Sequence, residues 1–452
     1  MFTPRHFFAC LFLAVFSGVL PIAAGAAQRS PTKNVIIMIS DGMGYNHSEA
    51  ASIYANGRAN CQVYADFPVR LAMSTYALDG SYAGEKAWAS FESINQGATD
   101  SAAAATAMAS GHKTHRGTIG MVPGKDGSLR PVENLVERAE KLGKASGLVT
   151  SVPFSHATPA AFAVHDLNRK NGSTIANIML RDSAVDVIIG CGHPFFDGDG
   201  RRLPAARTFK SVGDKDTWAE LQAGSLGGDA DGDGRADPWT LVEERSAFQQ
   251  LAMGAAPKRL LGIPQAGKTL QQGRSGELHA RPYAVPLLKT VPTLTELSRA
   301  ALNVLDNDPD GFFLMIEGGA VDWASHDNQS GRMIEEQLDF DRTVAAVVRW
   351  VETQSSWEET LLIVTGDHET GCLTGSGSDP DWQPLVNRGR NQLPGMEWHH
   401  DYHTNSLIPL FAKGQGAERL LRMVQGHDPV RCAYIDNTAV AKAAFAAFTA
   451  LE

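Results

Sequence analysis

Asp322 and His326 are the pair of side chains whose spacing most clearly predicts chemistry. They lie in the segment Glu317-Gly-Gly-Ala-Val-Asp322-Trp-Ala-Ser-His326. Residues four apart share one face of a helix, so this carboxylate and this imidazole can bind the same metal ion. Glu317 lies five residues before Asp322 and could serve a neighbouring ion. The alternative is an i,i+4 pair on a helix surface, and we favour the metal site.

Ser101 is the candidate nucleophile. It follows Gly97-Ala98-Thr99-Asp100 and begins an alanine-rich run, which favours a helix. The free N–H groups and the positive dipole at a helix N-terminus suit a bound phosphate. No nearby histidine is indicated as a base, so a metal ion would lower the pKa of the hydroxyl. The simpler alternative is that Thr99, Asp100 or Ser101 only caps the helix.

Further carboxylates and imidazoles lie where apolar runs begin or end. Asp41 follows residues 34–40, Asp367 and His368 follow residues 361–365, and His403 precedes residues 407–412. Open α/β sheets place their ligand crevice at the ends of strands, so these side chains are expected to lie together. A single member would have a simpler explanation, such as Asp41 capping a helix. The spacing alone does not choose among His399, His400 and His403 as a ligand.

The elements that position these residues alternate between strands and helices. Apolar runs predict buried parallel strands over residues 34–40, 147–152, 185–190, 312–316, 361–365 and 407–412. Helical patterns follow Asp100 and cover residues 132–144, 293–304 and 333–353. This order predicts an α/β fold with a mostly parallel central sheet and helices on both faces. We expect one catalytic domain over residues 27–452, with loop-rich insertions at about 193–286 and 375–402.

Composition limits the functions that the chain can have. Of 452 residues, 43% are apolar, which is enough for a large core and excludes a disordered protein. The chain has 40 basic and 50 acidic residues, so nonspecific binding to nucleic acid is not expected. An anionic substrate would need local attraction from metal ions or a few arginines.

Residues 1–26 have the pattern of a secretory signal peptide. Arg5 and His6 precede an apolar run over residues 7–16, and Ala24-Gly25-Ala26 supplies a cleavage site. The alternative, an N-terminal membrane anchor, is less favoured because the run is short. We expect a periplasmic or secreted protein that has no membrane segment after the signal is removed. Four cysteines then remain, Cys61, Cys191, Cys372 and Cys432, and either free thiols or two disulfides fit them.

An acidic segment predicts a structural calcium ion away from the other candidate residues. Asp229-Ala-Asp231-Gly-Asp233-Gly234-Arg-Ala-Asp237 matches the first part of a calcium loop, with oxygen ligands at positions 1, 3, 5 and 9. Position 12 is Thr240, so Glu243 or Glu244 would have to supply the closing ligand. An acidic turn without calcium fits the segment equally well.

Six motifs, taken in order, resemble the alkaline phosphatases and span nearly the whole chain after residue 26. They are Asp41-Gly-Met-Gly, Thr99-Asp100-Ser101-Ala-Ala, His156-Ala-Thr158-Pro-Ala, Glu317 to His326, Thr365-Gly-Asp367-His368-Glu-Thr-Gly and His403-Thr. Each motif is weak alone, and all six in order are highly specific. The resemblance implies a metal-dependent phosphomonoesterase with a serine nucleophile.

The resemblance also implies which residues form the site. One Zn²⁺ would bind Asp322, His326 and His403, a second Zn²⁺ would bind Asp41, Asp367 and His368, and Mg²⁺ would bind Asp41, Thr158 and Glu317. His403 matches the family's His-Thr step, and Arg169 matches its phosphate-binding arginine. The implied reaction is the hydrolysis of small phosphate monoesters at alkaline pH through a phosphoserine at Ser101, with release of inorganic phosphate. A homodimer is also implied.

Other functions fit fewer of these features. A phosphodiesterase of the same superfamily would share most ligands, but often uses threonine where this chain has Ser101. A sulfatase needs C/S-x-P-x-R, whereas Ser101 is followed by four alanines. A cytoplasmic phosphoglycerate mutase would not carry a signal peptide. A noncatalytic phosphate-binding protein would not need a full set of metal ligands and a nucleophile.

Two positions differ from one bacterial branch of the family. His156 stands where that branch has Asp, and Trp323 stands where it has Lys. The resemblance places both beside the magnesium ligands and the phosphate. With one carboxylate fewer, the third site is expected to accept another divalent ion readily and to respond to added magnesium. The alternative is that both residues only pack around the site.

Overall fold

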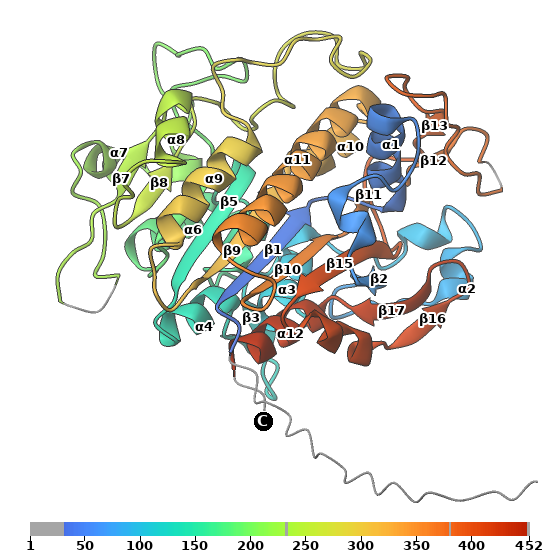
Figure 1. Cartoon of the computed structure of the whole chain (residues 1–452), viewed down its shortest axis with the longest axis horizontal. Helices are drawn as coiled ribbons and strands as arrows, with labels where there is room; N and C mark the ends of the chain where they lie inside the picture. Colours follow the sequence, from blue (N-terminus) through green and yellow to red (C-terminus); the bar gives the residue numbers. More distant parts are fainter. Residues whose placement is uncertain (1–30, 231–233, 379–380, 450–452) are drawn as a thin grey trace, which may run out of the picture.

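An 11-stranded sheet runs through the centre of the molecule in this computed structural model, which describes residues 31–230, 234–378 and 381–449 (Figure 1). In spatial order its strands are β16 (Gly426–Asp428), β17 (Cys432–Asp436), β2 (Val69–Ser74), β15 (Ile408–Gly414), β10 (Thr360–Gly366), β1 (Asn34–Ser40), β9 (Phe312–Gly318), β5 (Ala145–Pro153), β6 (Val187–Cys191), β8 (Leu260–Gly262) and β7 (Thr240–Val242). All neighbours from β10 to β7 are parallel, and only β15 and β16 run the opposite way. The predicted mostly parallel α/β sheet is confirmed.

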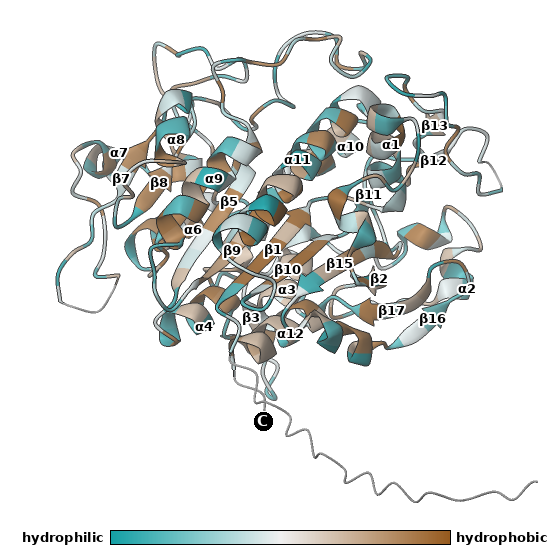
Figure 2. Cartoon of the chain, viewed as in Figure 1, coloured by the Kyte–Doolittle hydropathy of each residue, from teal (hydrophilic) through white to brown (hydrophobic). Residues whose placement is uncertain are grey.

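Helices cover both faces of this sheet. One face packs against α3 (Ser101–Ser110), α4 (Leu135–Lys141), α5 (Ala157–Ala161), α6 (Gly172–Arg181) and α12 (Thr438–Phe448), and the other against α8 (Arg245–Leu251), α9 (Leu294–Leu305) and α11 (Ser330–Gln354). In β1, Val35, Ile37 and Ile39 join the first core, whereas Ile36 and Met38 join the second. Such alternation follows from the two-residue period of a strand. Figure 2 shows these central strands as largely hydrophobic.

The remaining elements surround the sheet. They are α1 (Tyr45–Asn56), α2 (Gly84–Ala87), α7 (Lys215–Gln222), α10 (Ala320–His326), the pairs β3 (Met121–Pro123) with β4 (Leu129–Pro131), β11 (Glu369–Thr370) with β14 (His403–Thr404), and β12 (Thr374–Gly375) with β13 (Met396–Glu397), and short 3-10 helices at Val63–Asp66, Ser93–Asn95, Lys210–Val212 and Ala417–Met423. The pair β11 and β14 matters most for the site, because it joins the segment after β10 to the segment that carries His403.

One strand runs in a direction that the sequence did not predict. The apolar run at residues 407–412 forms β15, which is antiparallel to both β10 and β2. The segment between β10 and β15 stays at the edge of the sheet where β10 ends, since β14 pairs there with β11. The next strand therefore starts at that edge and runs back through the sheet.

The segment at residues 193–286 holds more regular structure than its composition indicates. It contains α7, α8, β7 and β8, and the last two extend the sheet at one end. The segment at residues 375–402 contains β13, whose partner β12 begins just before it. Strands of two or three residues carry too little alternation to be recognised in sequence.

Three other sequence predictions have different outcomes. The predicted signal peptide lies outside the described residues, and no helix within the described ranges is both long and apolar enough to cross a membrane. Cys61, Cys191, Cys372 and Cys432 are free thiols. In the predicted calcium loop, Asp231 and Asp233 lie outside the described residues, and the carboxylate of Asp237 lies 2.6 Å from Nζ of Lys258. Calcium binding there stays a prediction.

Candidate active site

Three neighbouring parallel strands bring buried carboxylates to one edge of the sheet. Ser40 of β1 lies opposite Gly366 of β10 and Gly318 of β9, so Asp41 and Asp367 leave their strands at the same level. Glu317 lies one residue before the end of β9. All three side chains are fully buried. The strand register therefore assembles this acidic cluster, as the strand-end motifs predicted.

Gly42 allows the cluster to close. Its φ is +77°, and its backbone N–H donates to Oδ1 of Asp367 at 3.0 Å. A Cβ at this position would lie 2.8 Å from Cα of Asp322, which is backbone that cannot easily move. Glycine is therefore needed both for the left-handed turn and for the close approach of α10.

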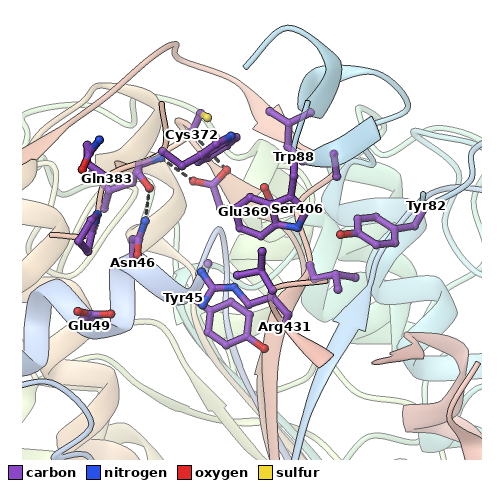
Figure 3. A pocket seen from close by; sticks show the side chains of 18 residues that line it. Tyr45, Asn46, Glu49, Tyr82, Trp88, Glu369, Cys372, Gln383, Ser406 and Arg431 are labelled. Carbon is purple, nitrogen blue, oxygen red and sulfur yellow. Dashed lines mark hydrogen bonds between the residues drawn. The ribbon is translucent and has the colours of Figure 1, made fainter. Parts of the chain in front are cut away.

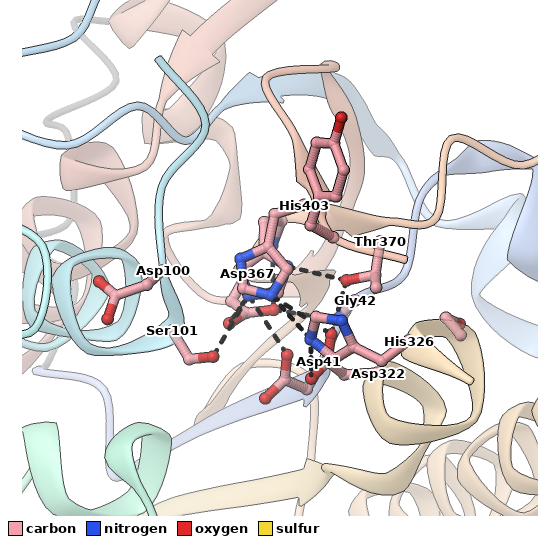
Figure 4. Close-up of polar contacts among 12 residues, drawn as sticks. Asp41, Gly42, Asp100, Ser101, Asp322, His326, Asp367, Thr370 and His403 are labelled. Carbon is pink, nitrogen blue, oxygen red and sulfur yellow. Dashed lines mark hydrogen bonds and ion pairs between the residues drawn. The ribbon is translucent and has the colours of Figure 1, made fainter. Parts of the chain in front are cut away.

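Asp322, His326 and His403 form the first candidate metal site (Figure 4). Nε2 of His326 lies 3.3 Å from Asp322 Oδ2 and 3.1 Å from Nε2 of His403, which in turn lies 3.6 Å from Asp322 Oδ1. Nδ1 of His326 lies 2.6 Å from the carbonyl oxygen of Asp401, and Nδ1 of His403 lies 2.9 Å from that of Thr99. Each Nδ1 thus donates a proton to a carbonyl, so Nε2 is the nitrogen that each imidazole offers to a metal ion.

His368 connects this site to a second one. Its Nε2 lies 3.1 Å from Asp367 Oδ2 and 3.5 Å from Asp41 Oδ1. Its Nδ1 lies 3.3 Å from the hydroxyl of Thr370, which donates to Asp322 Oδ1 at 2.6 Å. Asp41, Asp367 and His368 have the spacing of metal ligands. So do Asp322, His368 and His403, a group in which His368 stands in place of the predicted His326. The two predicted zinc groups therefore lie side by side.

The hydroxyl of Ser101 faces the same nitrogen of His368. Ser101 begins α3, and its Oγ lies 3.2 Å from His368 Nε2. In a serine–histidine–carboxylate triad the carboxylate would contact the other imidazole nitrogen. In this site Asp41 and Asp367 share Nε2 with the serine, so a cation bound by all of them explains the arrangement better than a general base.

A third group of ligands surrounds Asp41 on its other side. Asp41, His156 and Glu317 have the spacing of metal ligands, and Thr158 Oγ1 lies 3.5 Å from Asp41 Oδ2. The hydroxyl of Thr150 donates a short hydrogen bond to Glu317. The predicted magnesium residues, which all offer oxygen atoms, thus lie together. His156 lies beside them and adds an imidazole nitrogen to the group.

Arg169 is held next to both the nucleophile and the third group. Its Nη1 donates to Asp100 Oδ2 at 3.0 Å, and its Nη2 lies 3.3 Å from Nε2 of His156. Asp100 also caps α3 by accepting from Ala103 N–H, and it accepts from Gly117 N–H. The guanidinium is therefore held between the residue that precedes Ser101 and a member of the third group, and its phosphate-binding role stays a prediction.

Buried negative charge in the cluster would be stabilised by bound cations. Burial and the neighbouring carboxylates raise the pKa of Asp41 well above its usual value, and burial raises the pKa of Glu317 and of Asp367 to about 7. Burial lowers the pKa of His368, which keeps its imidazole neutral. Buried Oδ1 of Asp41, Oε1 of Glu317, Oδ2 of Asp367 and Nδ1 of His156 lack hydrogen-bond partners. Divalent cations would satisfy these carboxylates, and the oxygen and nitrogen donors fit Zn²⁺ and Mg²⁺.

The structure separates His403 from its two neighbours. Nε2 of His399 is hydrogen-bonded to Thr374 Oγ1 at 2.8 Å, and its ring stacks on Phe91. The ring of His400 stacks on Tyr402. Only His403 of the three belongs to a metal-ligand group among the described residues. Trp323 and His156 make a T-shaped ring contact, with 5.7 Å between the ring centroids.

Several contacts that support the site were not predicted from the sequence. Asp100 orients Arg169, Thr150 binds Glu317, and Thr370 links His368 to Asp322. Asp100 and Thr370 lie inside the quoted motifs, next to Ser101 and close to His368 in the sequence. That closeness could have indicated that they support the site. Thr150 carries no such signal, because only strand pairing places it opposite Glu317.

Glu369 anchors the segment that carries His368. Its carboxylate accepts from the backbone N–H groups of Cys372 and Leu373 and from the hydroxyl of Thr404, the residue after His403. It also lines a separate pocket of about 240 Å³ beside Tyr45 and Trp88 (Figure 3). None of the predicted site residues lines that pocket, so the contacts of Glu369 with its own segment and with Thr404 are its link to the candidate site.

Comparison with known proteins identifies relatives of this chain. A family model described as alkaline phosphatase matches residues 32–392. Alkaline phosphatase 3 of Bacillus subtilis is 29% identical over 369 residues, which cover 80% of this chain and 67% of the relative. Alkaline phosphatase H of Pseudomonas aeruginosa is 29% identical over 441 residues, which cover 89% of this chain and 84% of the relative. His403 lies beyond the range that the family model matches.

Solved structures share the fold. Alkaline phosphatase from the Antarctic bacterium TAB5 matches with a TM-score of 0.63 and 22% identity, covering 94% of this chain and all of that one. A histidine-to-aspartate mutant of the TAB5 enzyme, solved with Mg bound in the M3 site, matches with a TM-score of 0.62 and 21% identity, again covering 94% of this chain and 100% of that one.

The bridge through Thr370 gives a first prediction. Thr370→Val keeps the shape of the side chain but removes the hydroxyl that lies between Asp322 and His368. Zinc affinity should fall by about 10- to 100-fold, because such outer partners fix the ligand tautomer. Competition with a chelating dye measures this affinity, and Thr370→Ser, which retains the hydroxyl, is the matched control. Equal zinc affinity in the valine and serine variants would show that the bridge has no such role.

Metal removal gives a second prediction. In metal-free protein the pKa of Glu317 and of Asp367 is about 7 because of burial. The same carboxyl groups have a pKa of about 4 in an unfolded chain. Between these values the folded state binds more protons than the unfolded state, so the free energy of unfolding should fall as the pH rises from about 4 to about 7. The free energy of unfolding of the metal-loaded protein should instead rise as the pH rises over this range, because the carboxylates must be deprotonated to bind the metal.

Thermal melting with and without a chelator across this pH range measures both trends. Asp367→Asn removes one of the titrating carboxyls and should make the decline of the metal-free protein shallower. The same pH dependence with and without chelator would contradict a metal centre formed by these carboxylates.

Proposed function

The chain belongs to the alkaline phosphatase family, and on this premise we propose that it hydrolyses phosphate monoesters at alkaline pH through a phosphoserine at Ser101. Asp322, His326 and His403 would hold one Zn²⁺, and Asp41, Asp367 and His368 would hold a second. Asp41, Thr158 and Glu317 would hold Mg²⁺, with His156 beside them. Bound divalent cations would neutralise the carboxylates, lower the pKa of nearby hydroxyl groups and attract the anionic ester.

The observation that supports this proposal most strongly is the position of the Ser101 hydroxyl. It lies 3.2 Å from His368 Nε2, the nitrogen that also faces Asp41 and Asp367. The hydroxyl gives its proton to solvent, and its oxygen bonds to phosphorus while the ester P–O bond breaks on the opposite side and the leaving alkoxide takes a proton from water. Water then attacks the phosphoserine, the bond from phosphorus to Oγ breaks, Oγ regains a proton, and inorganic phosphate leaves. Higher pH increases the deprotonated fraction of each nucleophile, which is consistent with alkaline activity.

Arg169 orients the phosphate in this scheme. A guanidinium can donate two parallel hydrogen bonds to phosphate oxygens. Asp100 holds one edge of the group at 3.0 Å and is itself fixed by the first turn of α3. Because Ser101 is the next residue after Asp100, one cap positions both the nucleophile and the phosphate-binding group.

We also propose, from the sequence, that residues 1–26 export the protein to the periplasm or the exterior and that the mature chain is one catalytic domain. The resemblance to the family supports a homodimer. A phosphodiesterase remains the second candidate function, since the metal ligands alone would serve either ester. The serine rather than threonine at position 101 favours monoesters.

Removal of the nucleophile gives a third prediction. Ser101→Ala should abolish the labelled phosphoenzyme that acid quench captures from wild type, while zinc and magnesium contents measured by elemental analysis stay unchanged. Monoester turnover should drop by several orders of magnitude, about the loss that removal of a nucleophile causes in other hydrolases. A diester assayed alongside should be hydrolysed poorly by wild type. Labelled phosphate on the alanine variant would mean that another residue is the nucleophile.

The third metal site gives a fourth prediction. His156 lies beside Asp41 and Glu317, and its Nδ1 has no hydrogen-bond partner in the structure. Added magnesium should activate wild type, and His156→Asp should tighten magnesium binding and reduce that activation, because Mg²⁺ prefers oxygen ligands. A TAB5 mutant with aspartate in place of a histidine was solved with Mg bound in its M3 site, and His156→Asp makes the same type of exchange.

Magnesium titration of wild type and variant measures the difference. Since His156 also contacts Arg169, inhibition by inorganic phosphate is measured in parallel to separate metal binding from phosphate binding. Two magnesium curves that superimpose, or that are both flat, would show that His156 does not control this site.

A further inference from the structure

A hollow of about 420 Å³ opens beside the candidate metal centre. Trp323, His326 and Asp327 line it from the region of α10, and Gly198, Arg207, Lys268, Gln272 and Gly273 line it from the segment at residues 193–286. Its volume lies within the range of about 300 to 1,000 Å³ that small-molecule pockets span. The hollow thus lies between His326, a proposed metal ligand, and the segment at residues 193–286, which has no role in the proposed reaction.

The hollow lies on the side of the cluster where the alcohol of the ester would leave. Ser101 and His326 lie on opposite sides of the carboxylates in Figure 4. In an in-line displacement the leaving oxygen departs opposite the attacking oxygen. The alcohol half of a substrate attacked by Ser101 would therefore extend past His326 and into the hollow.

The hollow has a net positive charge. The side chains of Arg207 and Lys268 are exposed, and within the described ranges neither has an ion-pair partner or a side-chain hydrogen bond. Asp327 also lines the hollow, and its Oδ2 accepts from Nε2 of Gln272 at 3.4 Å and of Gln329 at 3.2 Å. In contrast, Arg201 of the same segment is paired with Asp199 at 3.0 Å.

Backbone contacts fix the positions of the two cationic residues. The N–H of Arg207 donates to the carbonyl of Pro194 at 2.8 Å. Next to Lys268, the N–H of Gly267 donates to the carbonyl of Asp197 at 2.9 Å. A Cβ at Gly198 would lie 2.3 Å from the carbonyl oxygen of Gly273, so the two stretches of backbone touch there. Arg207 therefore projects from the stretch that follows β6 and Lys268 from the stretch that follows β8, and hydrogen bonds join the two stretches.

We propose that this hollow binds the alcohol half of the substrate and that Arg207 and Lys268 select monoesters whose alcohol carries a second anionic group, a carboxylate or a phosphate. This inference rests on the proposed phosphatase function. Trp323, which is held against His156, gives the carbon skeleton a flat apolar surface. The chain as a whole has a formal charge of −10, so the attraction of a dianionic alcohol depends on local cations such as these.

A matched set of esters tests the proposal. Alkyl phosphates with chains of three to six carbons are compared when the far end is a methyl, a carboxylate, a phosphonate or an ammonium group. The phosphonate represents a second phosphate that cannot be hydrolysed, so the set separates carboxylate from phosphate recognition. Wild type should show kcat/KM values about three- to tenfold higher for the anionic ends than for methyl, and lower values for ammonium.

Charge-removing variants identify the residues responsible. In Arg207→Gln with Lys268→Gln, the ratio of kcat/KM for anionic over methyl-ended esters should fall to about one, mainly through KM. Lys215→Gln, at an exposed position of α7 in the same segment, is the control and should keep the wild-type ratio. High salt should reduce the ratio in wild type and in the control, but not in the double variant.

Two outcomes would overturn the inference. They are equal kcat/KM values for anionic and methyl-ended esters in wild type, and a preference that survives in the double variant. If wild type hydrolyses none of the esters when zinc and magnesium are supplied, the proposed function itself fails. If the methyl-ended ester is hydrolysed well and only the preference is missing, the proposed function stands and this inference is wrong.

Discussion

Four carboxylates packed into one buried region are the constraint on which the rest of the structure depends. Asp41, Glu317 and Asp367 are fully buried, and Asp322 is 4% exposed. Unpaired charges in a protein interior are strongly unfavourable, so such a cluster persists only with hydrogen bonds and cations. Protein donors reach only part of it, since oxygens of Asp41, Glu317 and Asp367 lack partners. Histidine nitrogens face the same region, and together with these carboxylates they form candidate groups for metal ions, which would balance the charge.

The fold provides this arrangement through its strand order. Because β1, β9 and β10 are neighbours and parallel, the residues at their ends meet at one edge of the sheet. The helix α10 follows β9 directly and adds Asp322 and His326, whereas β14 pairs with β11 and adds His403. The chain stays at this edge from the end of β10 to His403. β15 therefore starts at this edge and runs antiparallel to β10. The segment at residues 193–286 then completes one wall of the hollow beside the metal centre.

The sequence predicts which strand-end side chains lie together because each has a local signal. Asp41 and Asp367 directly follow apolar runs, and Asp322 and His326 have helical spacing. His403 could not be separated from His399 and His400 by spacing, and needed the family resemblance. Contacts between distant segments carry no local signal. Asp100 meets Arg169 across 69 positions, and Arg207 and Lys268 reach the hollow through a segment whose composition predicts loops. Those contacts required the structure.

Anomalous X-ray diffraction from crystals grown with zinc and magnesium tests the metal centre most directly. Data collected on both sides of the zinc absorption edge should show one zinc peak among Asp322, His326 and His403, and a second among Asp41, Asp367 and His368. Density without a zinc anomalous signal should lie beside Asp41, Thr158 and Glu317. The absence of zinc peaks from these two groups in active, zinc-saturated crystals, or peaks bound by other residues, would contradict a catalytic centre built on these ligands.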